Sequence, residues 1–239
     1  SRSGEQEIAA KNYDGAATFF RGYQQLIVSG YGLYNADFIY AGAKLASVAA
    51  LRGDYDAAVR QQLLVVKLSE KVHGLDSIAT AQAVVELASF MFFGKRVNEV
   101  LGLQCLALYL FDLIGAPLNP YSAICLQELQ MMYSQSKDVR STCLILEETL
   151  RRHALMYGES DERLLFSLEK LAYFKAENGE FRDAALLQAR HALITSQLLK
   201  GGRYGGNAKV TAELEKQLAE SNKLKEAYVK KRDEHAEGK

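Results

Sequence analysis

The chain has 239 residues, of which 49% are hydrophobic and 24% charged, and its 29 basic residues balance 29 acidic ones. This composition is typical of a globular protein with a large core and argues against disorder. Zero formal net charge argues against a surface that is basic throughout, as in many dedicated nucleic-acid binders. Three cysteines are too few for a disulfide framework and indicate a reduced, intracellular chain.

No segment predicts insertion into a membrane. The longest apolar run, 97–114, is interrupted by polar and acidic side chains, unlike a membrane span. The first four residues, Ser1 to Gly4, lack the apolar core of a signal peptide. We therefore expect a fragment of a longer protein that does not span a membrane.

Three series of residues recur with one period. One series consists of glycines that follow long amphipathic segments, 41 to 43 residues apart: Gly32, Gly74, Gly115, Gly158 and the pair Gly201-Gly202. A second series of helix breakers lies between them, at similar intervals: Asn12, Gly53, Gly94, Lys137 and Gly179. The third series recurs every 42 residues: Leu45, Leu87, Leu129 and Leu171. Agreement among the three series predicts an internal repeat.

Each period contains two helical patterns joined by a tight turn. In chain order the predicted helices are Glu5–Lys11, Tyr13–Ser29, Phe38–Leu51, Tyr55–Val72, Ser77–Phe93, Arg96–Leu113, Asn119–Ser134, Val139–Tyr157, Ser160–Glu177, Phe181–Leu199 and Asn207–Glu234. Ser77 and Ser160 are placed to cap the helices that they begin. Gly74 is placed to end a helix in the left-handed conformation.

The residue after the repeated leucine is small in three of four repeats, as Ala46, Ala88 and Ala172. A small residue lets two antiparallel helices approach closely, which is the packing of tetratricopeptide (TPR) repeats. Their usual period is about 34 residues, so each helix here is about one turn longer. We expect an all-α fold, a right-handed superhelix of TPR-like helix pairs with a 42-residue period. HEAT or armadillo repeats are the alternative.

This fold predicts three segments. Residues 1–200 form about four and a half helix pairs, residues 201–206 a Gly-rich linker, and residues 207–239 a capping helix rich in Lys and Glu. The segment 201–206 is unlike a phosphate-binding loop because Asn207 stands where Lys-Ser/Thr would follow, and because a helix rather than a strand precedes it.

No pattern predicts catalysis, a cofactor or a metal site. Adjacent carboxylates such as Glu147 and Glu148 diverge by about 100° on a helix, and no nucleophile has a nearby base. His153 and His191 each follow an arginine late in a second helix. We interpret both as complementing the helix dipole, with a phosphate or acidic-peptide contact as the alternative.

The concave face of such a superhelix is lined by the first helix of each pair. Positions −5, −2, +2 and +5 from the repeated leucines mark sixteen residues that include one charge, and we expect about half of them in the core. The candidate groove residues are Tyr40, Ser47, Gln82, Ser89, Phe92, Gln127, Met131, Ser134, Glu169 and Tyr173. This uncharged groove predicts an apolar or amphipathic protein or peptide ligand.

The stretch from Leu51 to Asp76 carries a family resemblance. It contains a Gly-Asp-Tyr turn, a Gln-Gln pair inside the following helix, and the ending Ser-Glu-Lys-Val-His-Gly-Leu-Asp. It resembles the TPR region of the clustered mitochondria family, and the similarity extends more weakly to the segment from Phe181 and to the terminal helix. The His-Pro pair usual after the final Asp is replaced here by Ser77-Ile78.

The resemblance implies a cytoplasmic, non-enzymatic protein that is needed for mitochondrial distribution and associated with mRNAs for mitochondrial proteins. The partners that it implies are translation initiation factor 3 or ribosome-associated factors, and RNA. Kinesin light chains share the period and are the alternative, as a cargo-binding motor adaptor. Their first helices usually carry Asn-Leu-Ala, whereas Lys44, Glu86, Glu128 and Lys170 precede the repeated leucines here. An RNA-binding repeat module is the other alternative.

Overall fold

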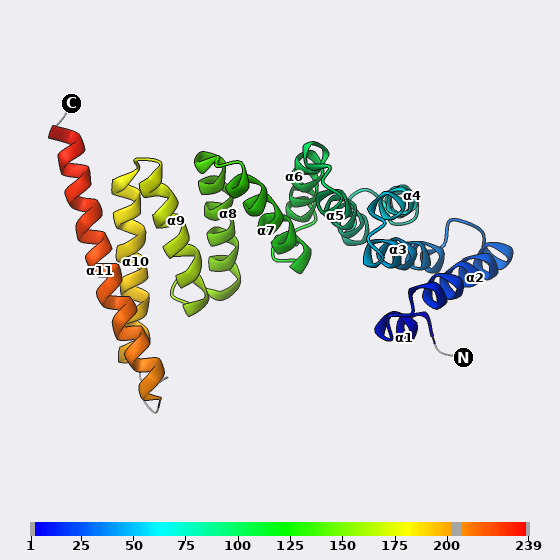
Figure 1. Cartoon of the computed structure of the whole chain (residues 1–239), viewed down its shortest axis with the longest axis horizontal. Coiled ribbons are helices and arrows are strands. Elements are labelled where there is room, and N and C mark those ends of the chain that lie inside the picture. The colour runs from blue at the N-terminus through cyan, green and yellow to red at the C-terminus, as the bar shows by residue number, and fades with distance from the viewer. Residues whose placement is uncertain (1–2, 202–206, 238–239) are drawn as a thin grey trace. The chain divides into compact units, whose positions relative to one another are not determined.

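The computed structural model describes residues 3–201 and 207–237, and every regular element in these ranges is helical (Figure 1). The helices are α1 (Gly4–Ala9), α2 (Tyr13–Tyr31), α3 (Ala36–Leu51), α4 (Tyr55–His73), α5 (Ile78–Phe93), α6 (Val97–Leu113), α7 (Pro120–Gln135), α8 (Val139–Tyr157), the 3₁₀ turn η1 (Glu162–Leu164), α9 (Leu165–Glu177), α10 (Phe181–Lys200) and α11 (Ala208–Glu237). The all-α prediction is confirmed. The handedness of a superhelix stays a prediction.

The chain divides into two compact units, Ser1–Glu128 and Leu129–Lys239, and the boundary falls inside α7. Within each unit successive helices pack as antiparallel neighbours. In unit 1 these neighbours are α1 with α2, α2 with α3, α3 with α4, α4 with α5, and α5 with α6. In unit 2 they are α8 with α9, α9 with α10, and α10 with α11.

The turn inside each helix pair repeats with the predicted interval. A residue with positive φ stands at the same place in five successive turns, each 42 residues after the last: Lys11, Gly53, Lys95, Lys137 and Gly179. The next residue begins the second helix, and in three of the five turns its side chain accepts a backbone hydrogen bond: Asn12, Asp54 and Asp138. The left-handed residue therefore lies one residue before the predicted breaker Asn12 and one residue after the predicted breaker Gly94.

The glycines after the second helices end them as predicted. Gly32, Gly74 and Gly158 have φ of 80°, 88° and 92°, and each N–H donates to the carbonyl four residues earlier. Only glycine enters this region at little cost. The Ser77 cap is also confirmed, because its Oγ accepts the Thr80 N–H at 3.1 Å.

The predicted start of the ninth long helix at Ser160 is wrong. Asp161 caps the short turn η1 by accepting the Arg163 N–H, and regular α-helix begins only at Leu165. The carboxylate accepts a hydrogen bond from the first free N–H groups in a 3₁₀ turn, which delays the α-helix by one turn.

Of the predicted linker 201–206, Gly201 caps α10, and residues 202–206 lie outside the described ranges.

The Leu-Ala pairs pack as expected. Leu87, Leu129 and Leu171 are at most 2% exposed, and Ala46, Ala88 and Ala172 are completely buried. Only Leu45 among the repeated leucines is partly exposed. In unit 1 the largest core cluster joins α5, α6 and the start of α7, through Val84, Phe111 and Cys125 among others. Of the three free cysteines, Cys125 and Cys143 are buried and Cys105 is exposed on α6.

Helix α11 covers one side of α10. Its buried residues Leu214, Ser221 and Tyr228 are seven apart and face inward, while its Lys and Glu side chains lie mainly on the exposed side. Tyr228 packs with Ala184 and Ala185 at the start of α10. A helix that is apolar on one side and charged on the other ends a stack of repeats without leaving an apolar end exposed. The terminal helix in its described part thus has the packing of a cap.

Candidate functional site

The ten predicted groove residues lie on the first helix of each pair, α3, α5, α7 and α9, and none of them is buried. We call the exposed surface of these helices the first-helix face. Tyr40 is 44% exposed and Tyr173 55%, and Gln127, Ser134 and Glu169 are exposed too. The other five are partly exposed: Ser47, Gln82, Ser89, Phe92 and Met131.

The expectation that about half of the sixteen marked positions are core residues is wrong. Val85, at 1% exposure, is buried, and the other fifteen are partly or fully exposed. The core is formed from the residues on the opposite side of each first helix, beginning with the repeated leucine and alanine. The marked stripe is therefore more surface than core.

Polar contacts link successive first helices in unit 1. Glu5 of α1 accepts a hydrogen bond from the Tyr40 hydroxyl at 2.6 Å and pairs with Lys44 of α3 at 3.0 Å. The Tyr121 hydroxyl of α7 donates to Glu86 of α5 at 3.3 Å. Burial raises the pKa of Glu86, opposed by the hydrogen bonds from Tyr121 and Gln62 and by the charge of Lys44. These contacts fix the spacing between neighbouring first helices.

In unit 2 the first-helix face is aromatic and acidic. On α9, Phe166 and Tyr173 are 64% and 55% exposed, and Glu169 and Glu177 are exposed between and beyond them. Glu169 is the one charge among the marked positions, and Glu177, one residue beyond them, adds a second carboxylate on the same side of α9.

A groove in unit 2 lies on other helices. It has a volume of about 550 Å³ and runs between α8 and α10, above Leu171 and Lys175 of α9. Leu155 and Leu186, about three-fifths exposed, stand on its two sides. Two ion pairs lie in its lining, Glu147 with Lys175 and Glu159 with Arg190. Sequence reasoning missed this second-helix groove. Leu144 and Leu186 are exposed and one period apart, but of the two only Leu186 lines the groove.

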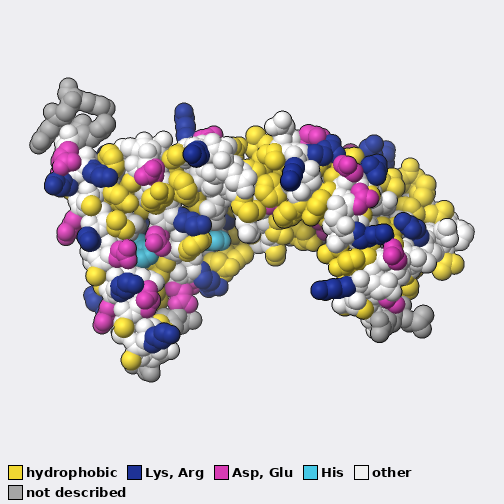
Figure 2. All heavy atoms as spheres, in the orientation of Figure 1, with side chains coloured by type: hydrophobic (Ala, Val, Ile, Leu, Met, Phe, Trp, Pro, Cys, Tyr) yellow, Lys and Arg dark blue, Asp and Glu magenta, His cyan; other side chains and the backbone are white. Residues whose placement is uncertain are grey.

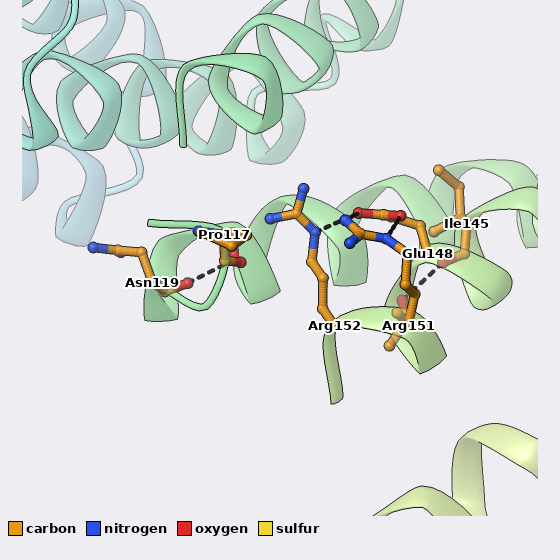
Figure 3. A network of polar contacts seen from close by, with 8 residues as sticks. Pro117, Asn119, Ile145, Glu148, Arg151 and Arg152 are labelled. Carbon is orange, nitrogen blue, oxygen red and sulfur yellow. Dashed lines mark hydrogen bonds and ion pairs between the residues drawn. The ribbon is translucent and has the colours of Figure 1, made fainter. Parts of the chain in front are cut away.

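Glu148 forms a local ion-pair cluster with two arginines on α8, a second helix of unit 2. Glu148 accepts from Arg151 at 2.7 Å and from Arg152 at 2.6 Å, with both guanidinium groups turned toward its carboxylate (Figure 3). Arg151 therefore forms an ion pair with Glu148 within α8. On the visible surface of α8 to α11, basic and acidic side chains are interspersed (Figure 2). No broad basic surface for a nucleic-acid backbone is seen on that face.

The two histidines that follow arginines are packing residues. His191 is 5% exposed, and its Nδ1 lies 2.7 Å from the Ser221 hydroxyl of α11. His153 is half-buried, with its Nδ1 3.4 Å from the Ser167 hydroxyl of α9. Burial lowers the pKa of both. The alternative of a phosphate contact does not suit His191, because its side chain is buried.

The described side chains form neither a metal-ligand cluster nor a membrane-spanning helix. Within residues 3–201 and 207–237, no three His, Cys, Asp or Glu side chains cluster as metal ligands would. Across the same ranges, no helix is both long and apolar enough to cross a bilayer.

Comparison with known proteins gives sequence relatives. No family model matches the chain. The clustered mitochondria protein homolog of Xenopus tropicalis is 25% identical over 154 residues, 64% of this chain and 12% of that protein. The homolog of Brugia malayi is 25% identical over 172 residues, 72% of this chain and 12% of that protein. The resemblance to the clustered mitochondria family is confirmed. The chain spans only about an eighth of the length of these relatives.

Solved structures give the fold. TPR-like repeats of a Podosopora anserina kinesin light chain superpose with a TM-score of 0.62 at 16% identity, over 82% of this chain and 92% of that one. BtubC (BKLC) of P. vanneervenii superposes with a TM-score of 0.56 at 14% identity, over 99% and 93%. At this identity the likeness shows the fold alone. The chain is a TPR-like repeat protein, and the HEAT or armadillo alternative is not needed.

Proposed function

We propose that this chain is a non-enzymatic interaction module that binds a protein or peptide through its first-helix face. The clustered mitochondria relatives support a role for the whole protein in mitochondrial distribution, in the cytoplasm. The role in translation of mRNAs for mitochondrial proteins, with translation initiation factor 3 or ribosome-associated factors as partners, is part of the proposal at the level of the whole protein.

One observation carries the proposal. The ten candidate residues all retain exposed surface, although the opposite sides of the same helices carry buried core residues. Exposed tyrosine and methionine on a rigid helical stack suit peptide recognition, since large side chains with few rotatable bonds bind at low entropic cost. A TPR-like fold without a built catalytic constellation supports a binding role over an enzymatic one.

Two other functions make different predictions. A kinesin light chain-like adaptor would use the same face for cargo, but the sequence relatives belong to the clustered mitochondria group rather than to kinesin light chains. An RNA-binding module would need unpaired cations along one surface, and its affinity would fall steeply with salt. The ligand that binds to the first-helix face distinguishes these two functions from the proposed one.

The experiment begins with a random 12-residue peptide library selected on the immobilised chain. Selected peptides are then titrated by calorimetry against Ser89→Arg, Met131→Arg and Tyr173→Arg, which add bulk and charge on the first-helix face. We expect each variant to weaken binding of at least one peptide class by ten-fold or more, about 1.4 kcal/mol. Circular dichroism verifies that each variant is folded.

Matched controls carry the same charge on the second-helix groove. Leu155→Arg and Leu186→Arg lie on α8 and α10, at positions about as exposed as Tyr173. They are expected to leave peptide binding unchanged. If these controls lose binding while the first-helix variants keep it, the groove between α8 and α10 is the site and the proposal is wrong. Selective binding of single-stranded RNA over every peptide would also overturn it.

A further inference from the structure

Helix α9 presents an aromatic–acidic stripe, formed by Phe166, Glu169, Tyr173 and Glu177. These residues are spaced i, i+3, i+7 and i+11, so they share one side of the helix. All four are exposed, with Phe166 at 64% and Tyr173 at 55%. The other side of α9 is buried, at Leu168, Leu171 and Ala172. The two rings are therefore apolar side chains of α9 that face solvent.

The rings are held in place from the inside of unit 2. Tyr173 packs edge to face on Phe174, with centroids 5.3 Å apart and an interplanar angle of 81°. Phe174 in turn packs against the core cluster of α8, α9 and α10. A ligand therefore meets a ring whose orientation is set in advance, which lowers the entropic cost of binding.

The stripe already accommodates a cation. The Lys170 ammonium lies 4.4 Å from the centroid of the Phe166 ring, within the range of a cation–π contact. That contact lies at the N-terminal end of the stripe. Two turns further along, Tyr173 is 55% exposed, and no cation from the described part of the chain lies over its ring.

Two carboxylates flank Tyr173 along the stripe, and Lys170, also one turn before Tyr173, lies over the Phe166 ring. Glu169 and Glu177 stand one turn before and one turn after it, and neither forms an ion pair or hydrogen bond with another described residue. The nearby Lys175 is committed elsewhere, with its ammonium 2.6 Å from both Glu147 and Glu180. An open ring between two unneutralised carboxylates attracts a cation by two independent effects, the ring quadrupole and charge.

We propose that the aromatic–acidic stripe binds a basic peptide segment of a protein partner, with an arginine side chain stacked on Tyr173 and its guanidinium paired with Glu169 or Glu177. Arginine fits better than lysine because its planar group stacks on a ring and bonds a carboxylate at the same time. Phosphate backbones are disfavoured, because the two carboxylates repel them. This inference rests on the proposed function and names the chemistry of its ligand.

The test uses the whole chain and three fluorescein-labelled 12-residue peptides in anisotropy titrations. One contains three arginines among Ala, Ser and Leu, the second has citrulline in place of each arginine, and the third has glutamate. Citrulline keeps the shape of arginine but lacks its charge. We expect the arginine peptide to bind at least five-fold tighter than the citrulline peptide, and the glutamate peptide to bind weakest.

Variants assign that preference to the stripe. Glu169→Gln/Glu177→Gln is expected to abolish the preference for arginine over citrulline and most of its salt dependence. Tyr173→Ala is expected to weaken the arginine peptide about five-fold, and Tyr173→Phe to restore it. The matched control Glu213→Gln/Glu220→Gln removes two exposed carboxylates from α11 and is expected to change nothing.

The outcomes separate the two proposals. Tyr173→Ala could weaken binding of the arginine and citrulline peptides equally while the double Gln variant binds as the wild type does. In that case the proposal of a basic ligand is wrong, and the proposal that the first-helix face binds a peptide is retained. If both pairs of Glu→Gln changes weaken binding equally, the effect is one of net charge and the stripe is not the site. A single-stranded RNA oligonucleotide that binds tighter than the arginine peptide overturns the inference.

Discussion

The amide of Gln104 in α6 donates from Nε2 to the carboxylate of Glu128 in α7, and both side chains are buried. The same arrangement occurs one repeat earlier, where Gln62 Nε2 of α4 donates to Glu86 of α5 at 3.0 Å. In both pairs the amide oxygen accepts no hydrogen bond from a described residue. The pairs tie a second helix to the next first helix and leave one buried acceptor unsatisfied each.

The first prediction concerns this buried carboxyl. Burial raises the pKa of Glu128, against the hydrogen bonds from Ser89 and Gln104. A raised folded-state pKa means that the contribution of Glu128 to stability is fully present below its ordinary pKa of 4.5 and is lost as pH rises through the folded-state value. Glu128→Gln removes the buried charge, and the amide of the new glutamine can donate a hydrogen bond to Gln104 Oε1.

We therefore expect Glu128→Gln to raise the free energy of unfolding by about 1 kcal/mol near neutral pH. Urea denaturation followed by circular dichroism at about pH 5 and about pH 7.5 measures it, and the gain over the wild type should be larger at the higher pH. Glu213→Gln, on the exposed side of α11, is the control. A variant that is less stable at both pH values would show that the ionised carboxylate is the stabilising form.

The second prediction concerns the packing of the cap helix. Burial lowers the pKa of His191 from its ordinary 6.5, and its ring contacts Ser221 of α11. Because the folded state disfavours the charged ring, the stability that neutral His191 contributes is present above pH 6.5 and is lost as pH falls below it. We expect hydrogen exchange in α11, corrected for intrinsic rates, to increase between about pH 7.5 and about pH 5.5.

His191→Gln is the matched variant, since it keeps a polar side chain that cannot gain a proton. The increase in exchange on acidification should be much smaller in this variant. An equal increase in both proteins would mean that other groups loosen α11.

The third prediction concerns an ion-pair cluster in unit 2. Lys175 joins α9 to Glu147 of α8 and to Glu180 before α10, and these two carboxylates hold its pKa above the ordinary value despite desolvation. Lys175→Met leaves two carboxylates without their counter-charge and is expected to lower the free energy of unfolding by about 1–2 kcal/mol. Lys230→Met, whose partner Glu234 is 3.8 Å away on the surface, should change it by less than about 0.5 kcal/mol. Equal losses would show that the cluster is no more than a surface ion pair.

The fourth prediction concerns the left-handed turns. Lys95 and Lys137 have φ of 64° and 57° at the position where two other repeats have glycine. Lys137→Gly is expected to stabilise the chain by up to about 1 kcal/mol, since glycine enters this region without steric cost. Lys67→Gly, inside α4, should destabilise by a similar amount. Thermal denaturation distinguishes these signs, and a loss in Lys137→Gly would show that its side chain stabilises the turn.

Sequence reasoning predicted most helix boundaries because they depend on local chemistry. Caps such as Asp54 and Ser77, and left-handed glycines such as Gly74, act within one turn of the chain. The start of α9 was missed because two candidate caps, Ser160 and Asp161, are adjacent and only one of them accepts the bond.

The candidate site was predictable as a stripe but not in its details. The repeat places Tyr40 and Tyr173 on first helices, and the structure leaves both exposed. The Gln–Glu pairs were missed, although Gln62 and Gln104 are one period apart, because a polar residue inside a second helix looks like a surface position until its partner is known. The groove between α8 and α10 depends on how two helices pack, which no single helix pattern records.

The most direct test of the account is a hydrogen-exchange footprint of the chain with and without a peptide from the library selection. The account predicts that protection on binding is concentrated in the first helices α3, α5, α7 and α9, while α8 and α10 change little. Protection concentrated in α8 and α10, around Leu155 and Leu186, would contradict it.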